Sequence, residues 1–113
     1  MQEITYKQVQ DFLSNTSFGF KPNQEKISFP VLQRIHRRLQ NGLRFDPIKV
    51  TIDGVISDGH HRYVCLSILG IEVETVKAGK NHNKAVYQWQ NIFLDTIDYD
   101  SPAKIKKFEY RYG

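Results

Sequence analysis

The sequence is poor in cysteine and in long apolar runs. Cys65 is the single cysteine, which excludes an internal disulfide and any metal site built from cysteines alone. No apolar stretch approaches the roughly 20 residues that a membrane-spanning helix requires. The first residues also lack the charged and apolar regions of a secretory signal peptide. We therefore expect a cytoplasmic protein that does not enter a membrane.

The excess of one sign of charge is also small. Lysine and arginine total 16 against 12 acidic residues, which gives a formal net charge of +4. This mild excess permits a nucleic acid or nucleotide partner without demanding one. The 113 residues are 40% hydrophobic and 12% aromatic, so the composition supplies a core for one domain over residues 1–113. Internal repeats and low-complexity tracts, which would indicate further domains, are missing.

Two helices are predicted in the first part of the chain. Thr5 and Gln8 have the spacing of a capping box, and apolar residues at helical spacing follow them over about 6–14. Pro30 suits the first position of a second helix, which Gly42 would end. The apolar stripe of this helix and the basic residues on its remaining surface are Val31, Leu32, Ile35 and Leu39, and Arg34, His36, Arg37 and Arg38.

The middle of the chain changes from a strand pattern to a helical one. Ile48, Val50 and Ile52 alternate with polar residues, which predicts a half-buried strand. Asp53-Gly54 predicts a two-residue hairpin turn that leads into a partner strand over 55–57. Asp58-Gly59 then precedes a helix over 60–69, after which apolar residues predict another strand within 71–76.

The last third is predicted to be mainly helical. Apolar residues over 85–93 indicate an amphipathic helix in which Trp89 and Phe93 pack on one face. Ser101-Pro102 suits the cap and first turn of a last short helix, and 108–112 alternates as an extended segment would. Because helices and short strands alternate without a regular βαβ rhythm, we expect an α+β fold.

The turn Ser57 to Arg62 carries the chemistry. A strand ends, Gly59 permits an unusual backbone angle, and a helix begins whose first N–H groups have no partner inside the helix. Together with the helix dipole they form an anion site, which Arg62 can reach with paired donors. A cation in a first helical turn costs about 0.3–1 kcal/mol from the dipole, which indicates a role other than helix stability.

Two other interpretations of this turn stay open. Asp58 can be an ordinary N-cap, worth about 1 kcal/mol, with His60, His61 and Arg62 forming a solvated first turn. The paired histidines also invite a metal site. Adjacent residues on a helix point about 100° apart, however, so we expect no dedicated metal site. A magnesium ion bound mainly by phosphate oxygens, with Asp58 or Glu25 as a carboxylate ligand, fits the sequence better.

The order of these elements resembles the ParB/sulfiredoxin superfamily. It runs helix, glycine, Pro-Ile strand, hairpin, Asp-Gly-His-X-Arg turn, helix and glycine. The residues that carry the resemblance are Asp46-Pro47-Ile48-Lys49-Val50, the hairpin, Ile56 to Tyr63 and Leu69-Gly70-Ile71. The resemblance implies a single small domain with a short mixed sheet and flanking helices. Its motif core is about 27–76, and a helical C-terminal extension follows over about 77–113.

Branches of the superfamily differ at this turn. Sulfiredoxins place a nucleophilic cysteine between the glycine and the His-Arg pair, where this chain has His60, while Cys65 lies on an apolar helix face. We therefore expect an inert core cysteine and no sulfiredoxin activity. The Gly-Glu-Arg-Arg pattern with which the partition proteins bind cytidine triphosphate is also missing. The turn resembles instead the branch that contains free serine kinases.

This resemblance implies a nucleotide-binding domain that acts as a phosphotransferase or nucleotide hydrolase. Its cofactors would be magnesium and a nucleoside di- or triphosphate. The phosphate-binding residues and the acidic helper would be Gly59, His60, His61 and Arg62, and Glu25. Asp58 and His61 would be catalytic, although whether the chain is an enzyme stays open.

The alternative is a non-catalytic module that binds DNA or a protein. Arg34, Arg37 and Arg38 lie on one face of the second helix and would contact phosphates. A solvated helix face is the plainer interpretation of the same residues.

Overall fold

The chain opens with a helix that its own side chains cap. The computed structural model describes residues 3–16, 19–79 and 85–112, and α1 spans Tyr6–Asn15. Thr5 Oγ1 accepts a hydrogen bond from the Gln8 N–H at 3.2 Å, and Gln8 Oε1 accepts one from the Thr5 N–H at 2.8 Å. The predicted capping box is therefore confirmed. Val9 and Leu13 point into the core.

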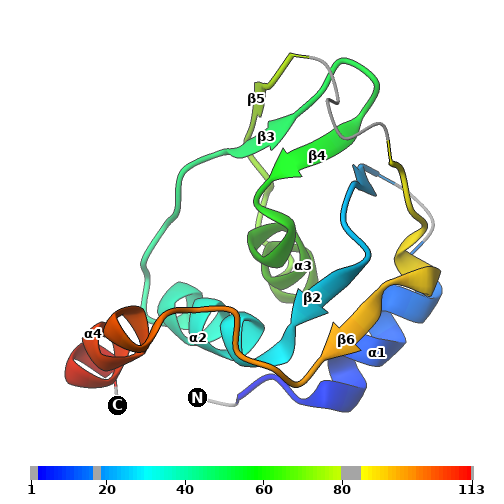
Figure 1. Ribbon diagram of the computed structural model, residues 1–113. Coiled ribbons are helices and arrows are strands. Elements are labelled where there is room, and N and C mark those ends of the chain that lie inside the picture. The colour runs from blue at the N-terminus through cyan, green and yellow to red at the C-terminus, as the bar shows by residue number, and fades with distance from the viewer. Residues whose placement is uncertain (1–2, 17–18, 80–84, 113) are drawn as a thin grey trace.

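Helix α2 follows a strand that pairs in parallel with a strand far along the chain. β2 (Lys26–Ser28) leads directly into α2 (Phe29–Gln40), whose N-cap is Ser28. β2 pairs in parallel with β6 (Phe93–Asp95), so the first and last thirds of the chain lie side by side (Figure 1).

A second sheet holds four short strands in the order β1-β4-β3-β5. The strands are β1 (Lys21–Pro22), β3 (Ile48–Val50), β4 (Val55–Asp58) and β5 (Thr75–Lys77). β3 and β4 are antiparallel as predicted, whereas β1 pairs with β4 and β5 pairs with β3 in parallel. The fold is therefore α+β with a short mixed sheet and flanking helices.

The hairpin loop is longer than predicted. The Thr51 N–H donates to the carbonyl of Val55 at 2.8 Å, which leaves three residues in the loop and places Gly54 at φ 78°. A three-residue loop that ends in a left-handed glycine is a common hairpin form, and the prediction of a two-residue turn was wrong. Ile52 is in this loop with its side chain 83% exposed, so it belongs neither to the strand nor to the core.

Helix α3 (His60–Leu69) runs from the end of β4 through the middle of the molecule and contacts α2 along its length (Figure 1). Its first residue lies directly after Gly59, and Gly70 ends it in a left-handed conformation. Cys65 is fully buried, its Sγ lies 3.3 Å from the carbonyl of Leu32, and burial raises its pKa to about 12. The prediction of an inert core cysteine is confirmed.

The last third differs from the prediction. The expected helix over 85–93 reduces to one 3₁₀ turn, η1 (Trp89–Asn91), followed directly by β6. Trp89 is buried, as expected, but Phe93 is 59% exposed because strand geometry turns it away from the core. The expected extended segment at 108–112 is instead the end of α4 (Pro102–Tyr112), which Ser101 and Pro102 begin as predicted. The region after 77 is therefore not a helical extension, because β6 belongs to a sheet.

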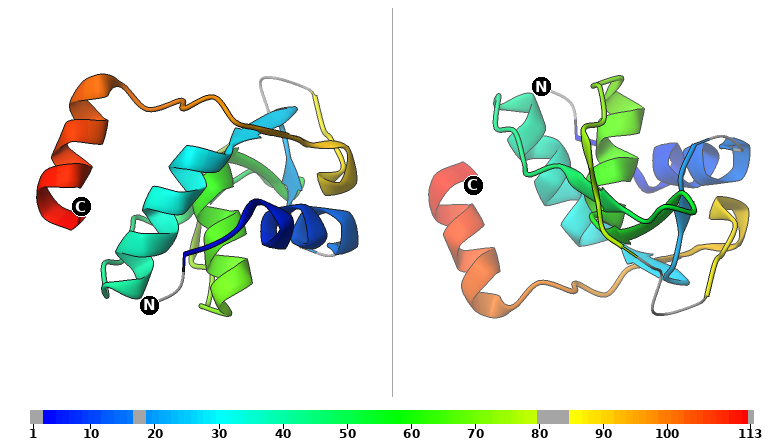
Figure 2. Two further views of the ribbon diagram at one scale, coloured as in Figure 1. Left: turned by 90° about the horizontal axis from the view of Figure 1, so that it is seen from below. Right: turned by 90° about the horizontal axis from the view of Figure 1, so that it is seen from above.

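Helix α4 stands at the far side of α2, joined to β6 by an extended segment (Figures 1 and 2). Phe108 of α4 is buried and packs near α2. Over the described ranges, no helix has both the length and the apolar character that crossing a bilayer requires.

Candidate functional site

The turn between β4 and α3 leaves the start of α3 without a side-chain cap. Gly59 is the N-cap residue at φ 105°, and its carbonyl accepts the first helical hydrogen bond, from the Tyr63 N–H at 2.8 Å. In the described part of the chain, no side chain caps the helix. The first N–H groups of α3 are therefore donors without helical partners, as an anion site requires.

Asp58 is not the N-cap of α3. It is the last residue of β4, opposite Lys49, and its Oδ2 accepts a hydrogen bond from Arg62 Nη2 at 3.1 Å. The interpretation of Asp58 as a cap was wrong, because the strand continues one residue further and leaves the cap position to glycine. The carboxylate is 63% exposed, whereas the Arg62 side chain is only 17% exposed.

Arg62 folds back over Gly59. A Cβ atom at position 59 would lie 2.7 Å from Arg62 Nη2 and 2.7 Å from Ile48 Cδ1, closer than real atoms approach. Glycine is thus required twice, for its positive φ and for the space that the guanidinium occupies. The hydrogen bond from Nη2 to Asp58 keeps the guanidinium at the start of α3.

These residues line a shallow hollow of about 270 Å³, which we call the anion hollow. Its lining is Gln24, Val31, Ile35, Ser57, Asp58, Gly59, His60, His61 and Arg62. The structure therefore brings together the predicted turn residues around one open space.

Both histidines are fastened to the backbone of the β1–β2 region. His60 Nε2 accepts a hydrogen bond from the Asn23 N–H at 3.1 Å, and His61 Nε2 accepts one from the Ser28 N–H at 2.8 Å. Burial lowers the pKa of each imidazole to about 4, so both are neutral at pH 7. Because each Nε2 is an acceptor, the proton of each neutral ring is on Nδ1, which is a donor.

Glu25, the predicted acidic helper, is not part of this arrangement. It is exposed just before β2, and the hollow is lined by its neighbour Gln24 instead. The described residues contain no group of three or more His, Cys, Asp or Glu side chains placed to hold a metal ion. Asp58 is the one carboxylate that lines the anion hollow.

The three arginines of α2 contact other parts of the chain. The Arg34 guanidinium donates to Asp98 and Asp100, and its side chain is 11% exposed. Arg37 pairs with Glu3, while the guanidinium of Arg38 lies 5.1 Å from the ring centre of Phe108. The interpretation as a solvated helix face was wrong, because Asp98, Asp100 and Phe108 contact that face.

A second hollow, of about 410 Å³, lies between α2 and α4, and we call it the basic hollow. Its lining is Val31, Arg34, Ile35, Arg38, Phe45, Arg62, Asp100, Lys104 and Lys107. It escaped prediction from the sequence because it forms only where α4 lies against α2. The one local signal is the spacing of Lys104 and Lys107, which places both on one face of a helix.

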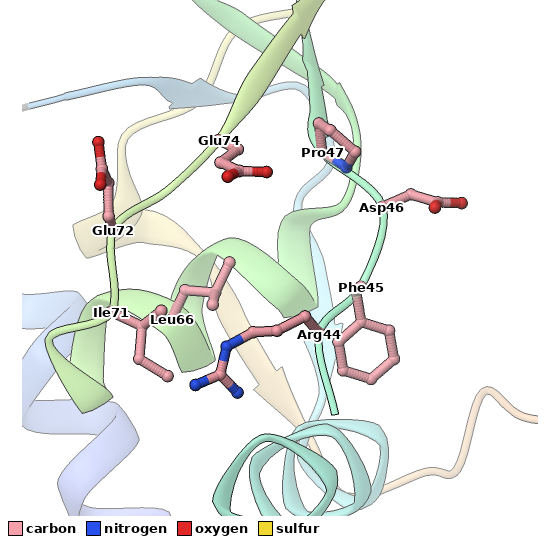
Figure 3. A pocket seen from close by; sticks show the side chains of 8 residues that line it. All are labelled: Arg44, Phe45, Asp46, Pro47, Leu66, Ile71, Glu72 and Glu74. Carbon is pink, nitrogen blue, oxygen red and sulfur yellow. The ribbon is translucent and has the colours of Figure 1, made fainter. Parts of the chain in front are cut away.

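A third hollow, of about 260 Å³, lies between the segment before β3 and the segment after α3 (Figure 3). It is lined by Arg44, Phe45, Asp46, Pro47, Leu66, Ile71, Glu72 and Glu74. Its three carboxylates outnumber its one guanidinium, and Arg44 Nη1 already donates to the carbonyls of Leu39 and Leu43. This acidic hollow does not suit a phosphate.

Comparison with known proteins assigns nothing to this chain. No protein-family model, no curated protein and no solved structure matches it. The geometry of the hollows is therefore the guide to function.

Proposed function

We propose that the chain is a ParB/sulfiredoxin-like domain that binds a nucleotide by its phosphate in the anion hollow. The observation that carries the proposal is the uncapped start of α3 beside the Arg62 guanidinium. Backbone N–H groups, the positive end of a helix dipole and a fork-shaped cation converge there, and together they suit a phosphate group.

The neutral histidines fit this assignment as hydrogen-bond donors. Each neutral ring carries its proton on Nδ1, because its Nε2 accepts a hydrogen bond from a backbone N–H. Such a donor can stabilise charge on a phosphate oxygen without carrying a charge of its own. His61 is the predicted catalytic histidine, and its role in the proposal is that of a hydrogen-bond donor, because its Nε2 already accepts the Ser28 N–H.

Magnesium would enter with the nucleotide. Because it is bound mostly by phosphate oxygens and water, one or two protein carboxylates suffice. Asp58, exposed at the edge of the anion hollow, is the residue available to contact the ion or to orient a nucleophile. On this arrangement we propose phosphoryl transfer or nucleotide hydrolysis as the reaction class, with Asp58 and His61 as the catalytic residues.

The test is nucleotide binding by the Arg62→Ala variant. Removing a charge-assisted contact should weaken affinity by about ten- to a hundredfold, because such contacts are worth about 1.5–3 kcal/mol. Isothermal titration calorimetry of the whole chain with adenine, cytosine and guanine nucleotides, with and without magnesium, measures this and identifies the base. Arg62→Lys should give an intermediate loss, since lysine keeps the charge without the fork.

Lys77→Ala is the matched control, because it removes the same charge from an exposed position in β5. Its nucleotide affinity should stay at the wild-type value. Equal losses of affinity in Arg62→Ala and Lys77→Ala would mean that only the net charge of the protein matters. Failure of the wild type to bind any nucleotide would overturn the proposal in favour of the DNA- or protein-binding module.

A further inference from the structure

The basic hollow gathers five cations, of which Arg34 and Arg62 have carboxylate partners. In the regions described by the structure, no ion pair joins Arg38, Lys104 or Lys107 to an acid. Asp100 is the one acidic residue in the lining, and both Arg34 Nε and Arg34 Nη2 already donate to its Oδ2, at 3.2 and 3.0 Å. The remaining positive charges face a concave surface, where their field favours a bound anion.

The position of these cations is set by packing. Arg34 anchors the segment before α4 through Asp98 and Asp100. Phe108 of α4 is buried, with the Arg38 guanidinium 5.1 Å from its ring centre. The lysines of α4 are therefore brought to α2 by contacts in which their own charges take no part.

The basic hollow adjoins the anion hollow. Arg62, Val31 and Ile35 line both, so Arg62 belongs to each and two apolar side chains lie along the boundary. A ligand that extends from one hollow to the other would thus meet donors at the start of α3, an apolar strip, and then lysines. Such a ligand has a weakly polar portion between two anionic groups.

We propose that the basic hollow is a second anion subsite of the same ligand, formed by Arg38, Lys104 and Lys107. The ligand class is a nucleotide with phosphate groups on both sides of its sugar, as in a nucleoside 3′,5′-bisphosphate. One phosphate binds at the start of α3, the sugar and base lie along Val31, Ile35 and Phe45, and the second phosphate binds the lysines of α4. This inference rests on the proposed function, because the first phosphate occupies the anion hollow.

The experiment compares three ligands of one base by calorimetry at fixed ionic strength without magnesium: the 5′-monophosphate, the 3′,5′-bisphosphate and the 5′-triphosphate. Wild-type protein should bind the bisphosphate at least about tenfold more tightly than the monophosphate. In the double variant Lys104→Gln, Lys107→Gln this ratio should fall to near one, while monophosphate affinity changes little. Lys106→Gln is the matched control, since Lys106 is on the same helix but lines neither hollow.

Each outcome separates the second subsite from the proposed function. If nucleotides bind but the ratio is the same in the double variant and in Lys106→Gln, the second subsite is wrong and the anion hollow stands. A lysine-dependent gain confined to the triphosphate would overturn the assignment of the second group to the far side of the sugar. If neither nucleotides nor pyrophosphate bind to wild-type protein, both proposals fall.

Discussion

At the scale of single residues, two polar side chains of the β4–α3 turn connect the start of α3 to a neighbouring segment. His60 and His61 accept hydrogen bonds from the backbone N–H groups of residues 23 and 28. Without these imidazoles, each N–H group would need another acceptor. They tie the start of α3 to the segment before α2. The donors left for a ligand are thereby held in fixed positions, which is what preorganised anion binding requires.

Gly59→Ala should show how tightly this turn is packed. A side chain at φ 105° costs about 1–2 kcal/mol in backbone strain, and the new Cβ would also meet Arg62 and Ile48 at 2.7 Å, for about another 1–3 kcal/mol. Urea unfolding measures the total. Gly54→Ala is the control, because its φ is 78° but nothing lies within 4 Å of its Cβ, so only the backbone cost should remain. Equal losses at both positions would contradict the contact with Arg62.

At the scale of elements, local signals predicted most of the first two thirds. The capping box of α1, the proline in the first turn of α2, the alternation in β3 and the glycines around α3 each act within a few residues of the structure they specify. The loop between β3 and β4 was predicted one residue too short, because the Thr51–Val55 hydrogen bond decides its length and the Asp-Gly pair does not.

The last third could not be predicted in the same way, because its structure depends on distant partners. β6 is a strand because Phe93, Leu94 and Asp95 pair with Lys26, Ile27 and Ser28, and apolar periodicity over 85–93 does not reveal that pairing. The candidate site divides along the same line. The turn residues that line the anion hollow are contiguous and could be singled out from the sequence, whereas the lining of the basic hollow depends on α4 lying against α2.

The double variant Asp98→Asn, Asp100→Asn should loosen α4. Arg34 lowers the pKa of Asp98 through their hydrogen bond, and losing both carboxylates leaves a mostly buried guanidinium without an anion. We expect a stability loss of about 1–3 kcal/mol, because the pairs are partly screened by water. Amide hydrogen exchange should also become faster in α4 while protection in α3 changes less.

Asp11→Asn provides the control for this change, since its pair with Lys7 is exposed on both sides. It should cost less than about 0.5 kcal/mol and leave exchange in α4 unaltered. Unchanged exchange in the double variant would mean that Phe108 alone holds α4 against α2.

At the scale of the whole molecule, residues 20–28 contact residues 89–95 far along the chain. The β2–β6 pair joins them through the backbone, and Trp89 adds a hydrogen bond to the carbonyl of Phe20 at 2.8 Å and a stacked contact with Tyr63. The two neutral histidines also contact the last third of the chain, since the ring of His60 meets Trp89 edge-on and that of His61 meets Tyr99 edge-on. Protonating either ring would remove the acceptor that Asn23 or Ser28 uses, so acid should weaken the whole structure.

The free energy of unfolding should therefore fall as pH drops from about 6.5 to 4. Burial lowers the pKa of His60 and of His61 to about 4. The charge of His61 also lowers the pKa of His60, whereas Asp58 raises it and Asp100 raises that of His61. Above the unfolded pKa of about 6.5 neither state binds a proton there, and full stability is present. Below this pKa the unfolded chain binds protons that the folded chain does not bind. The free energy of unfolding therefore falls by at most about 1.4 kcal/mol per pH unit for each histidine.

Urea unfolding at pH 7.5, 6.5, 5.5 and 5.0 measures this slope above the pH range where carboxylates dominate. The variant His60→Gln, whose amide oxygen can still accept a hydrogen bond, should be less stable at pH 7.5 but show a flatter slope. A wild-type stability constant down to pH 5.0 would show that the folded protein binds these protons as readily as the unfolded chain.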